Sequence, residues 1–140
     1  MIRKEVGLVF DAFINPEVSK HFWFTKSSGK LVEGQQVTWH WHMYGIEIVV
    51  LATKIIENEQ ITLEWGEPST IVKIEFEELS QQQTLVKITE SGFDLEGEEL
   101  LAKIKDSTGG FTTVLDGMKG YLEHGISLQL IADKYPKKHR

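Results

Sequence analysis

The sequence predicts an α+β fold, in which an antiparallel β-sheet with one apolar face is covered by a long C-terminal helix. Three observations lead to this prediction. Apolar residues recur at helical spacing over the first twenty or so residues, polarity alternates from about residue 30 to residue 90, and helical spacing returns near residue 95. A sheet with one apolar face needs a second layer to bury it, and the C-terminal helix can supply that layer.

Length and composition fit one globular domain, which we expect to span residues 1–140. The chain is 41% apolar and 26% charged, and its 140 residues are enough to bury a core without disulfides or metals. It has no cysteine, which excludes a disulfide framework, a thiolate nucleophile and a Cys-ligated metal. We expect residues 127–140 to form an extension beyond the core elements.

Charge and hydropathy limit the partners and the location. The net charge is −6 and the one dense cationic run is Lys137–Arg140, so we expect no nucleic-acid partner. No apolar run is long enough to cross a bilayer, and residues 1–5 lack the apolar stretch of a signal peptide. We therefore expect a cytoplasmic protein that does not insert into membranes.

Two short helices are expected near the N-terminus. Apolar side chains share one helical face across residues 6–14. Asn15 and Pro16 then end this helix and begin a second one, because Asn is a good N-cap and Pro suits the first helical position. Glu17 favours the positive helix start, and the second helix is expected at 17–22.

Six strands are expected between residues 30 and 90, separated by turn signals. Their ranges are 30–33, 35–43, 46–56, 61–65, 70–78 and 84–90. A two-residue loop at Tyr44-Gly45 predicts that Trp41 lies opposite Ile48 and that Trp39 lies opposite Val50.

The next two turns extend the same alternation. The first predicts that Ile56 lies opposite Ile61, and the second predicts that Leu63 lies opposite Val72. One sheet face then collects the apolar side chains of five strands, while Thr, His, Glu and Lys fill the other. The apolar face comprises Val37, Trp39, Trp41, Met43, Ile46, Ile48, Val50, Ile56, Ile61, Leu63, Trp65, Val72, Ile74, Phe76, Val86 and Ile88.

Residues after position 95 supply the covering layer. A short helix is expected at 95–106 and a longer one at 110–126, followed by a final turn or helix at 126–135. Gly125 is a suitable terminator for the longer helix. The apolar face of that helix comprises Phe111, Val114, Leu115, Met118 and Leu122.

Five segments carry a family resemblance through their residues, order and spacing. They read FDAFINPEVSKHFWF, LVEGQQVTWHW, ITLEW, VKITESGF and GGFTTVLDGMKGYLEHG. Together they span about residues 6–126 and resemble the START-like (SRPBCC, helix-grip) superfamily, in particular the branch similar to the activator of the ninety-kilodalton heat-shock protein ATPase. Two departures stand out. The family begins with a full strand where this chain offers only residues 1–5, which makes that strand look truncated, and Phe111 stands where Trp is usual.

The resemblance implies a helix-grip fold, in which a curved antiparallel sheet of six or seven strands wraps around the long C-terminal helix. It also implies a cavity between sheet and helix, because such cavities bind lipids, polyketides and other hydrophobic molecules in the superfamily. We therefore expect a small hydrophobic ligand, with no cofactor and no metal. The expected lining residues, each of which has packed core as its alternative role, are Trp39, Trp41, Met43, Ile48, Val50, Leu63, Trp65, Ile74, Phe76, Ile88, Phe111, Leu115 and Met118.

Two charged residues fall on the inward phase and are candidate polar anchors for a ligand. Lys54 lies between Ala52 and Ile56, and Glu90 follows Ile88. The alternative for Lys54 is a β-bulge that turns it outward, and the alternative for Glu90 is a solvent-exposed position past the strand end.

No catalytic or metal-binding constellation can be named. His40 and His42 form an H-x-H pair on the polar face, and Glu47 is expected opposite His42. A metal site needs a third ligand, so an exposed cross-strand pair is the preferred interpretation. The sequence has no G-x-S-x-G, P-loop, Rossmann or H-E-x-x-H pattern, and we assign no catalytic residue.

Other functions stay open beside ligand binding. A cyclase or hydrolase would use an acid or base in the cavity, such as Glu90. A co-chaperone of a heat-shock ATPase is less favoured, because the eukaryotic activators that resemble this chain carry an additional N-terminal domain. Val49 and Leu51 lie on the outer face and are either scattered apolar residues or a homodimer surface, so the protein is expected to be a monomer or a homodimer.

Overall fold

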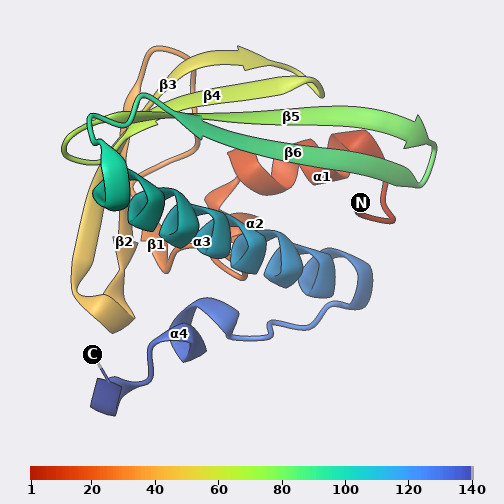
Figure 1. Cartoon of the computed structure of the whole chain (residues 1–140). Helices are drawn as coiled ribbons and strands as arrows, with labels where there is room; N and C mark the ends of the chain where they lie inside the picture. The colour runs from red at the N-terminus through yellow and green to blue at the C-terminus, as the bar shows by residue number, and fades with distance from the viewer. Residues whose placement is uncertain (140) are drawn as a thin grey trace.

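The chain folds as one curved antiparallel sheet that arches over a long helix (Figure 1). This computed structural model describes residues 1–139. The six strands are ordered as they occur in the sequence, so each strand pairs with the next along the chain. In Figure 1, β2 stands at the left, β3 to β6 run across the upper part of the view, and α3 crosses beneath β5 and β6. The predicted α+β helix-grip architecture is therefore confirmed.

The elements follow one another as two helices, six strands and a C-terminal helical region. Their bounds are α1 Val6–Ile14, α2 Pro16–Ser19, β1 Lys26–Ser27, β2 Gln36–Trp41, the 3-10 helix η1 His42–Tyr44, β3 Ile46–Ile56, β4 Gln60–Trp65, β5 Thr70–Ser80, β6 Gln83–Ser91, α3 Gly97–His124, α4 Leu130–Lys134 and η2 Lys137–His139.

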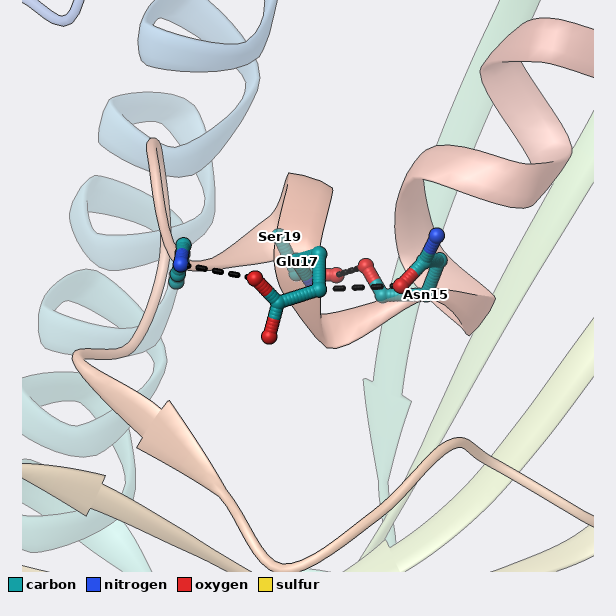
Figure 2. Close-up of polar contacts among 4 residues, drawn as sticks. Asn15, Glu17 and Ser19 are labelled. Atoms are coloured by element: carbon teal, nitrogen blue, oxygen red, sulfur yellow. Dashed lines mark hydrogen bonds and ion pairs between the residues drawn. The ribbon is translucent and has the colours of Figure 1, made fainter.

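The corner between α1 and α2 forms through the predicted cap. The Oδ1 atom of Asn15 accepts the backbone N–H of Glu17 at 3.1 Å, and Pro16 occupies the first turn of α2. The buried Ser19 hydroxyl donates to the backbone oxygen of Asn15 at 3.1 Å and secures the corner (Figure 2). Because α2 ends at Ser19, it is shorter than the predicted helix at 17–22.

The first predicted strand is wrong, because residues 30–33 do not pair with the sheet. The edge strand is instead β1, in which Lys26 pairs with His40. Leu31 is buried, and its N–H donates to the backbone oxygen of Ile14 at 3.3 Å. These residues therefore pack against the end of α1 rather than extend the sheet.

The hairpin between β2 and β3 has a longer loop than predicted. Residues 42–44 form a 3-10 turn, so Trp41 pairs with Ile46 and Trp39 pairs with Ile48, not with Val50. The register is displaced by two residues. Since side chains alternate with a period of two, the apolar residues stay on the predicted face.

A β-bulge between Ala52 and Lys54 changes the phase at the end of β3. Ile55, not Ile56, pairs with Ile61, and Ile56 is 36% exposed. The predicted pairing of Ile56 is therefore wrong. Across the next turn, the predicted pairing of Leu63 with Val72 is confirmed, and Ile61 pairs with Ile74 in the same register.

The two helices predicted at 95–106 and 110–126 are one continuous helix, α3. Gly109 lies between the two predicted ranges and Gly110 begins the second, but neither has a positive φ, and both lie inside the helix. Each helical Gly costs about 1 kcal/mol relative to Ala, and burial of Val114 and Met118 further along α3 stabilises the helix as a whole. The helix ends at Gly125 in the left-handed conformation, as predicted.

The core lies where the inner sheet face meets α1 and the C-terminal half of α3. Six side chains at its centre are fully buried, namely Val50, Ala52, Ile61, Leu63, Val72 and Ile74. Phe13 of α1 contacts Phe76 edge-on with ring centroids 5.6 Å apart, and Met118 of α3 is also fully buried. At the N-terminus, Ile2 exchanges backbone hydrogen bonds of 2.8 and 2.9 Å with Thr84 of β6. The main cavity lies towards the N-terminal half of α3, away from this tightly packed end.

Candidate ligand-binding site

The main cavity opens between the sheet, the first half of α3 and residues 127–135, which we call the C-terminal segment. Its volume is about 660 Å³. The apolar part of its wall consists of Trp23, Trp41, Ile46, Ile48, Trp65, Pro68, Phe93, Leu95, Phe111, Val114 and Ile131. Its side-chain polar groups belong to Glu67, Thr70, Glu90, Asp94, Lys103, Asp106 and Ser107. A mainly apolar wall with a few polar groups is typical of a small-molecule site.

Three aromatic residues form one wall of the cavity. The ring centroids of Trp23 and Trp65 are 5.9 Å apart, and those of Trp65 and Phe111 are 5.7 Å apart. The third pair, Trp23 and Phe111, has a separation of 6.1 Å. These spacings are within the favourable range for aromatic pairs, so the wall is held together by its own contacts.

Trp41 is fixed in the same wall by its polar edge. Its indole Nε1 donates to the backbone oxygen of Trp23 at 3.0 Å, in a buried hydrogen bond. The indole N–H thus has a partner although the side chain is only 8% exposed. The loop that follows α2 is joined in this way to β2.

Glu90 is the polar centre of the site. Its Oε2 atom accepts hydrogen bonds from Trp65 Nε1 at 3.2 Å and from the Thr70 hydroxyl. Its Oε1 atom accepts a hydrogen bond from the Ser107 hydroxyl of α3. The half-buried carboxylate is therefore held by donors from β4, β5 and α3, in the orientation that they impose.

A second cavity of about 320 Å³ adjoins the first. Glu90, Phe93, Ser107 and Phe111 line both spaces, and Ile88, Ile104 and Leu115 help to line the second one alone. The carboxylate of Glu90 consequently lies where the two spaces share a wall.

The C-terminal segment closes one side of the main cavity. Ile131 of α4 lines the space, and the Tyr44 hydroxyl donates to the backbone oxygen of Ile131. The Ser127 hydroxyl donates to the backbone oxygen of His21 at 3.1 Å, which attaches the segment near α2. The helix expected within residues 126–135 is present as α4.

The residues expected to line a cavity are divided between the walls of the cavities and the packed core. Trp41, Ile48, Trp65 and Phe111 line the main cavity, and Ile88 and Leu115 line the second one. Met43 lines a separate hollow of about 270 Å³ beside the C-terminal segment. The others are buried in the core and line none of these spaces; they are Trp39, Val50, Leu63, Ile74, Phe76 and Met118.

Of the two candidate anchors, Glu90 lines the main cavity and Lys54 does not. The bulge leaves Lys54 exposed, and it lines none of the cavities described above. Glu90 lies inside strand β6 and faces the cavity, not solvent past the strand end. The structural reason is the register, since Glu90 pairs with Val72 on the inner face.

Several wall residues were not expected from the sequence. Trp23 belongs to the aromatic run Phe22-Trp23-Phe24, which signals burial but not a cavity. Thr70 and Ser107 become neighbours of Glu90 only through strand pairing and through the position of α3 on the sheet. No sequence pattern marks such a contact in advance.

His40 lies on β2 with its side chain on the outer face of the sheet, whereas His42 lies in the 3-10 turn η1 that follows. His40, and not His42 as predicted, pairs with Glu47, and its Nδ1 lies 3.4 Å from Oε2 of that residue. The displaced β2–β3 register is the reason. Within residues 1–139, no group of three or more His, Asp or Glu side chains is placed to hold a metal ion. Over the same residues, no helix combines the length and hydropathy needed to cross a membrane.

The fold and the cavity together define a START-like helix-grip protein. The family model described as "Activator of Hsp90 ATPase homolog 1-like protein" matches residues 5–123, and the chain belongs to this family. No curated protein shows a significant match to the chain.

Solved structures share the fold over nearly the whole chain. Protein SSP2350 from Staphylococcus saprophyticus is 29% identical, with a TM-score of 0.81 over 92% of this chain and 91% of that one. The Aha1 dimer from Colwellia psychrerythraea is 20% identical, with a TM-score of 0.74 over 89% of this chain and 92% of that one. DynU16, a putative protein in the dynemicin biosynthetic locus, is 17% identical, with a TM-score of 0.74 over 90% of this chain and 46% of that one.

Proposed function

We propose that this protein binds a small hydrophobic ligand in the cavity between the sheet and α3. The observation that carries the proposal is a space of about 660 Å³ with an aromatic wall and one hydrogen-bonded carboxylate. Pockets of about 300–1,000 Å³ accommodate small organic molecules, and most of their lining is apolar.

The composition of the wall favours an apolar body for the ligand. Trp65 and Phe111 are half-buried, and both line the cavity. Covering exposed aromatic surface with a ligand contributes roughly 25 cal/mol per Å² removed from water. A flat or elongated hydrophobic molecule would cover more of these rings than a polar one and would bind more tightly.

The biosynthetic locus of one structural neighbour is consistent with this class of ligand. DynU16 belongs to the dynemicin biosynthetic locus, and it shares the fold of this chain. Hydrophobic polyketide-like molecules are accordingly suitable first candidates beside lipids.

A cavity-filling variant tests the proposal. Gly110 of α3 lines the main cavity, and a Cβ atom added there would meet no atom within 4 Å. Gly110→Phe would place a ring in the space and, because Gly is a poor helix former, would not weaken α3. Lys105→Phe is the matched control, since Lys105 is exposed on the same helix and lines none of the cavities described above.

The readout is the fluorescence of N-phenyl-1-naphthylamine, a neutral probe that brightens in apolar surroundings. We expect saturable binding by the natural chain and by Lys105→Phe, and strongly reduced binding by Gly110→Phe. Equal binding by all three proteins would place the probe outside the cavity and contradict the proposal.

A further inference from the structure

The ionisable groups around the main cavity are predominantly acidic. Glu67, Glu90, Asp94 and Asp106 line it, and Lys103 is the single cationic side chain among its described lining residues. Carboxylates around a hollow with apolar walls create a negative potential, because field lines are focused where water is scarce. A cation is therefore favoured inside this space, and an anion is disfavoured.

Glu90 can bind a further donor. A carboxylate oxygen can accept two hydrogen bonds, and Oε1 of Glu90 accepts one among the described residues, from Ser107. Thr70 and Trp65 hold the other oxygen, so the carboxylate is fixed in place before a ligand arrives. A ligand N–H that reaches Oε1 would find an oriented, negatively charged acceptor.

The aromatic wall is compatible with the same charge. Trp65 donates its N–H to Glu90 and also forms ring contacts with Trp23 and Phe111. Aromatic faces attract cations within about 6 Å, and Trp does so most strongly. The acidic acceptor and the electron-rich rings thus lie together in one cavity.

From these contacts we infer that the ligand is an apolar amine, with a protonated nitrogen at Glu90 and an apolar body against Trp23, Trp65 and Phe111. The inference rests on the proposed function and specifies its ligand class. An alkylammonium group resembles the Lys side chain, whose pKa of about 10.4 keeps it charged at neutral pH.

Three probes with the same apolar body test this inference, namely decylamine, decan-1-ol and decanoate. Their dissociation constants are measured by isothermal titration calorimetry below micelle formation, in low salt. We expect decylamine to bind at least about ten-fold more tightly than decan-1-ol, because both can donate to the carboxylate but only the ammonium adds the coulombic attraction of a positive charge. Decanoate should bind most weakly.

Glu90→Gln supplies the second comparison, with Glu64→Gln as its control. Glu64 is exposed on β4 and lines none of the described cavities. We expect Glu90→Gln to lose about ten-fold in decylamine affinity and with it the preference for decylamine over decan-1-ol, while Glu64→Gln keeps that preference.

The outcomes separate the two proposals. Equal binding of decylamine and decan-1-ol by the natural chain, or preferred binding of decanoate, would refute the amine and leave the hydrophobic site standing. An amine preference that persists in Glu90→Gln would refute the assigned contact. Failure of all three probes to bind would contradict both proposals. If Glu90→Gln fails to fold, the relative affinities of the three probes for the natural chain still test whether the ligand is an amine.

Discussion

The indole of Trp65 on β4 donates to Glu90 on β6 at 3.2 Å, across the strand that separates them. Both side chains stand on the inner face, where Trp65 pairs with Thr70 and Val72 pairs with Glu90. Thr70 donates to the same carboxylate oxygen. This contact couples the aromatic wall of the cavity to its polar centre.

Removal of this indole donor should destabilise the fold while keeping an aromatic ring in the wall. Trp65→Phe deletes the N–H that reaches the half-buried carboxylate. A hydrogen bond to a charged group contributes about 1.5–3 kcal/mol, and we expect a loss near the lower end in urea unfolding. Val49→Ala, at a side chain that is 53% exposed on the outer face, should change stability by less than about 0.5 kcal/mol. Equal effects of the two variants would argue against the contact.

Glu123 should contribute a pH-dependent part of the stability. Burial raises the pKa of its carboxyl, but hydrogen bonds from Lys119 at 2.6 Å and from the Arg3 N–H at 3.1 Å, with the positive charges of both residues, outweigh burial and lower the pKa overall. A folded-state pKa below the unfolded one stabilises the protein at neutral pH, and this contribution is lost as the pH falls through the folded-state value.

Urea unfolding at two pH values tests this linkage. Glu123→Gln should lose about 0.5–1 kcal/mol at pH 7, the range of a well-placed ion pair, and the loss should shrink by about pH 3. A deficit of the same size at both pH values would show that the carboxylate charge is not the source.

The contact between α3 and Phe22, in the turn after α2, leaves little room beyond a Cβ atom at Gly117. A Cβ atom there would lie 3.4 Å from the Cβ of Phe22 and 3.6 Å from its backbone oxygen. Gly117→Leu should therefore destabilise the fold by about 1–3 kcal/mol through overpacking. Gly110→Phe on the same helix should not, because Gly110 faces the open cavity. Thermal unfolding of the two variants compares them, and a stable Gly117→Leu protein would contradict this packing.

Tyr44 should hold the C-terminal segment against the cavity. Tyr44→Phe removes the hydroxyl that donates to Ile131 and keeps the ring. We expect faster amide hydrogen exchange in residues 127–135 with little change in global stability, since this segment is attached by few contacts. Ile71→Ala, at an exposed position of β5, is the control. Unchanged exchange in the segment would mean that other contacts hold it.

The two-residue period explains why the sequence predicts the sheet face better than the pairing. The longer loop at 42–45 displaced the β2–β3 register by two residues, which left Trp39 and Trp41 on the inner face. The bulge after Ala52 displaced the phase by one, which turned Lys54 and Ile56 outward. The sequence allows either this bulge or an inward-facing Lys54, and it does not distinguish between the two.

Helix continuity and the cavity depend on tertiary contacts. The sequence predicts a break near Gly109, yet α3 continues as one helix from Gly97 to His124, with Val114 and Met118 buried in the core beyond the glycines. Glu90 was a candidate from its phase, whereas its donors Thr70 and Ser107 come from β5 and α3 and carry no local signal. The space itself depends on how the helix sits on the sheet, which no residue pattern determines.

Native mass spectrometry of the gently purified protein, followed by extraction and identification of bound small molecules, tests the central claim most directly. We predict a retained apolar molecule at one per chain, lost in Gly110→Phe and kept in Lys105→Phe. A natural chain that carries no ligand and also fails to bind added lipids, polyketides and apolar amines would contradict the account.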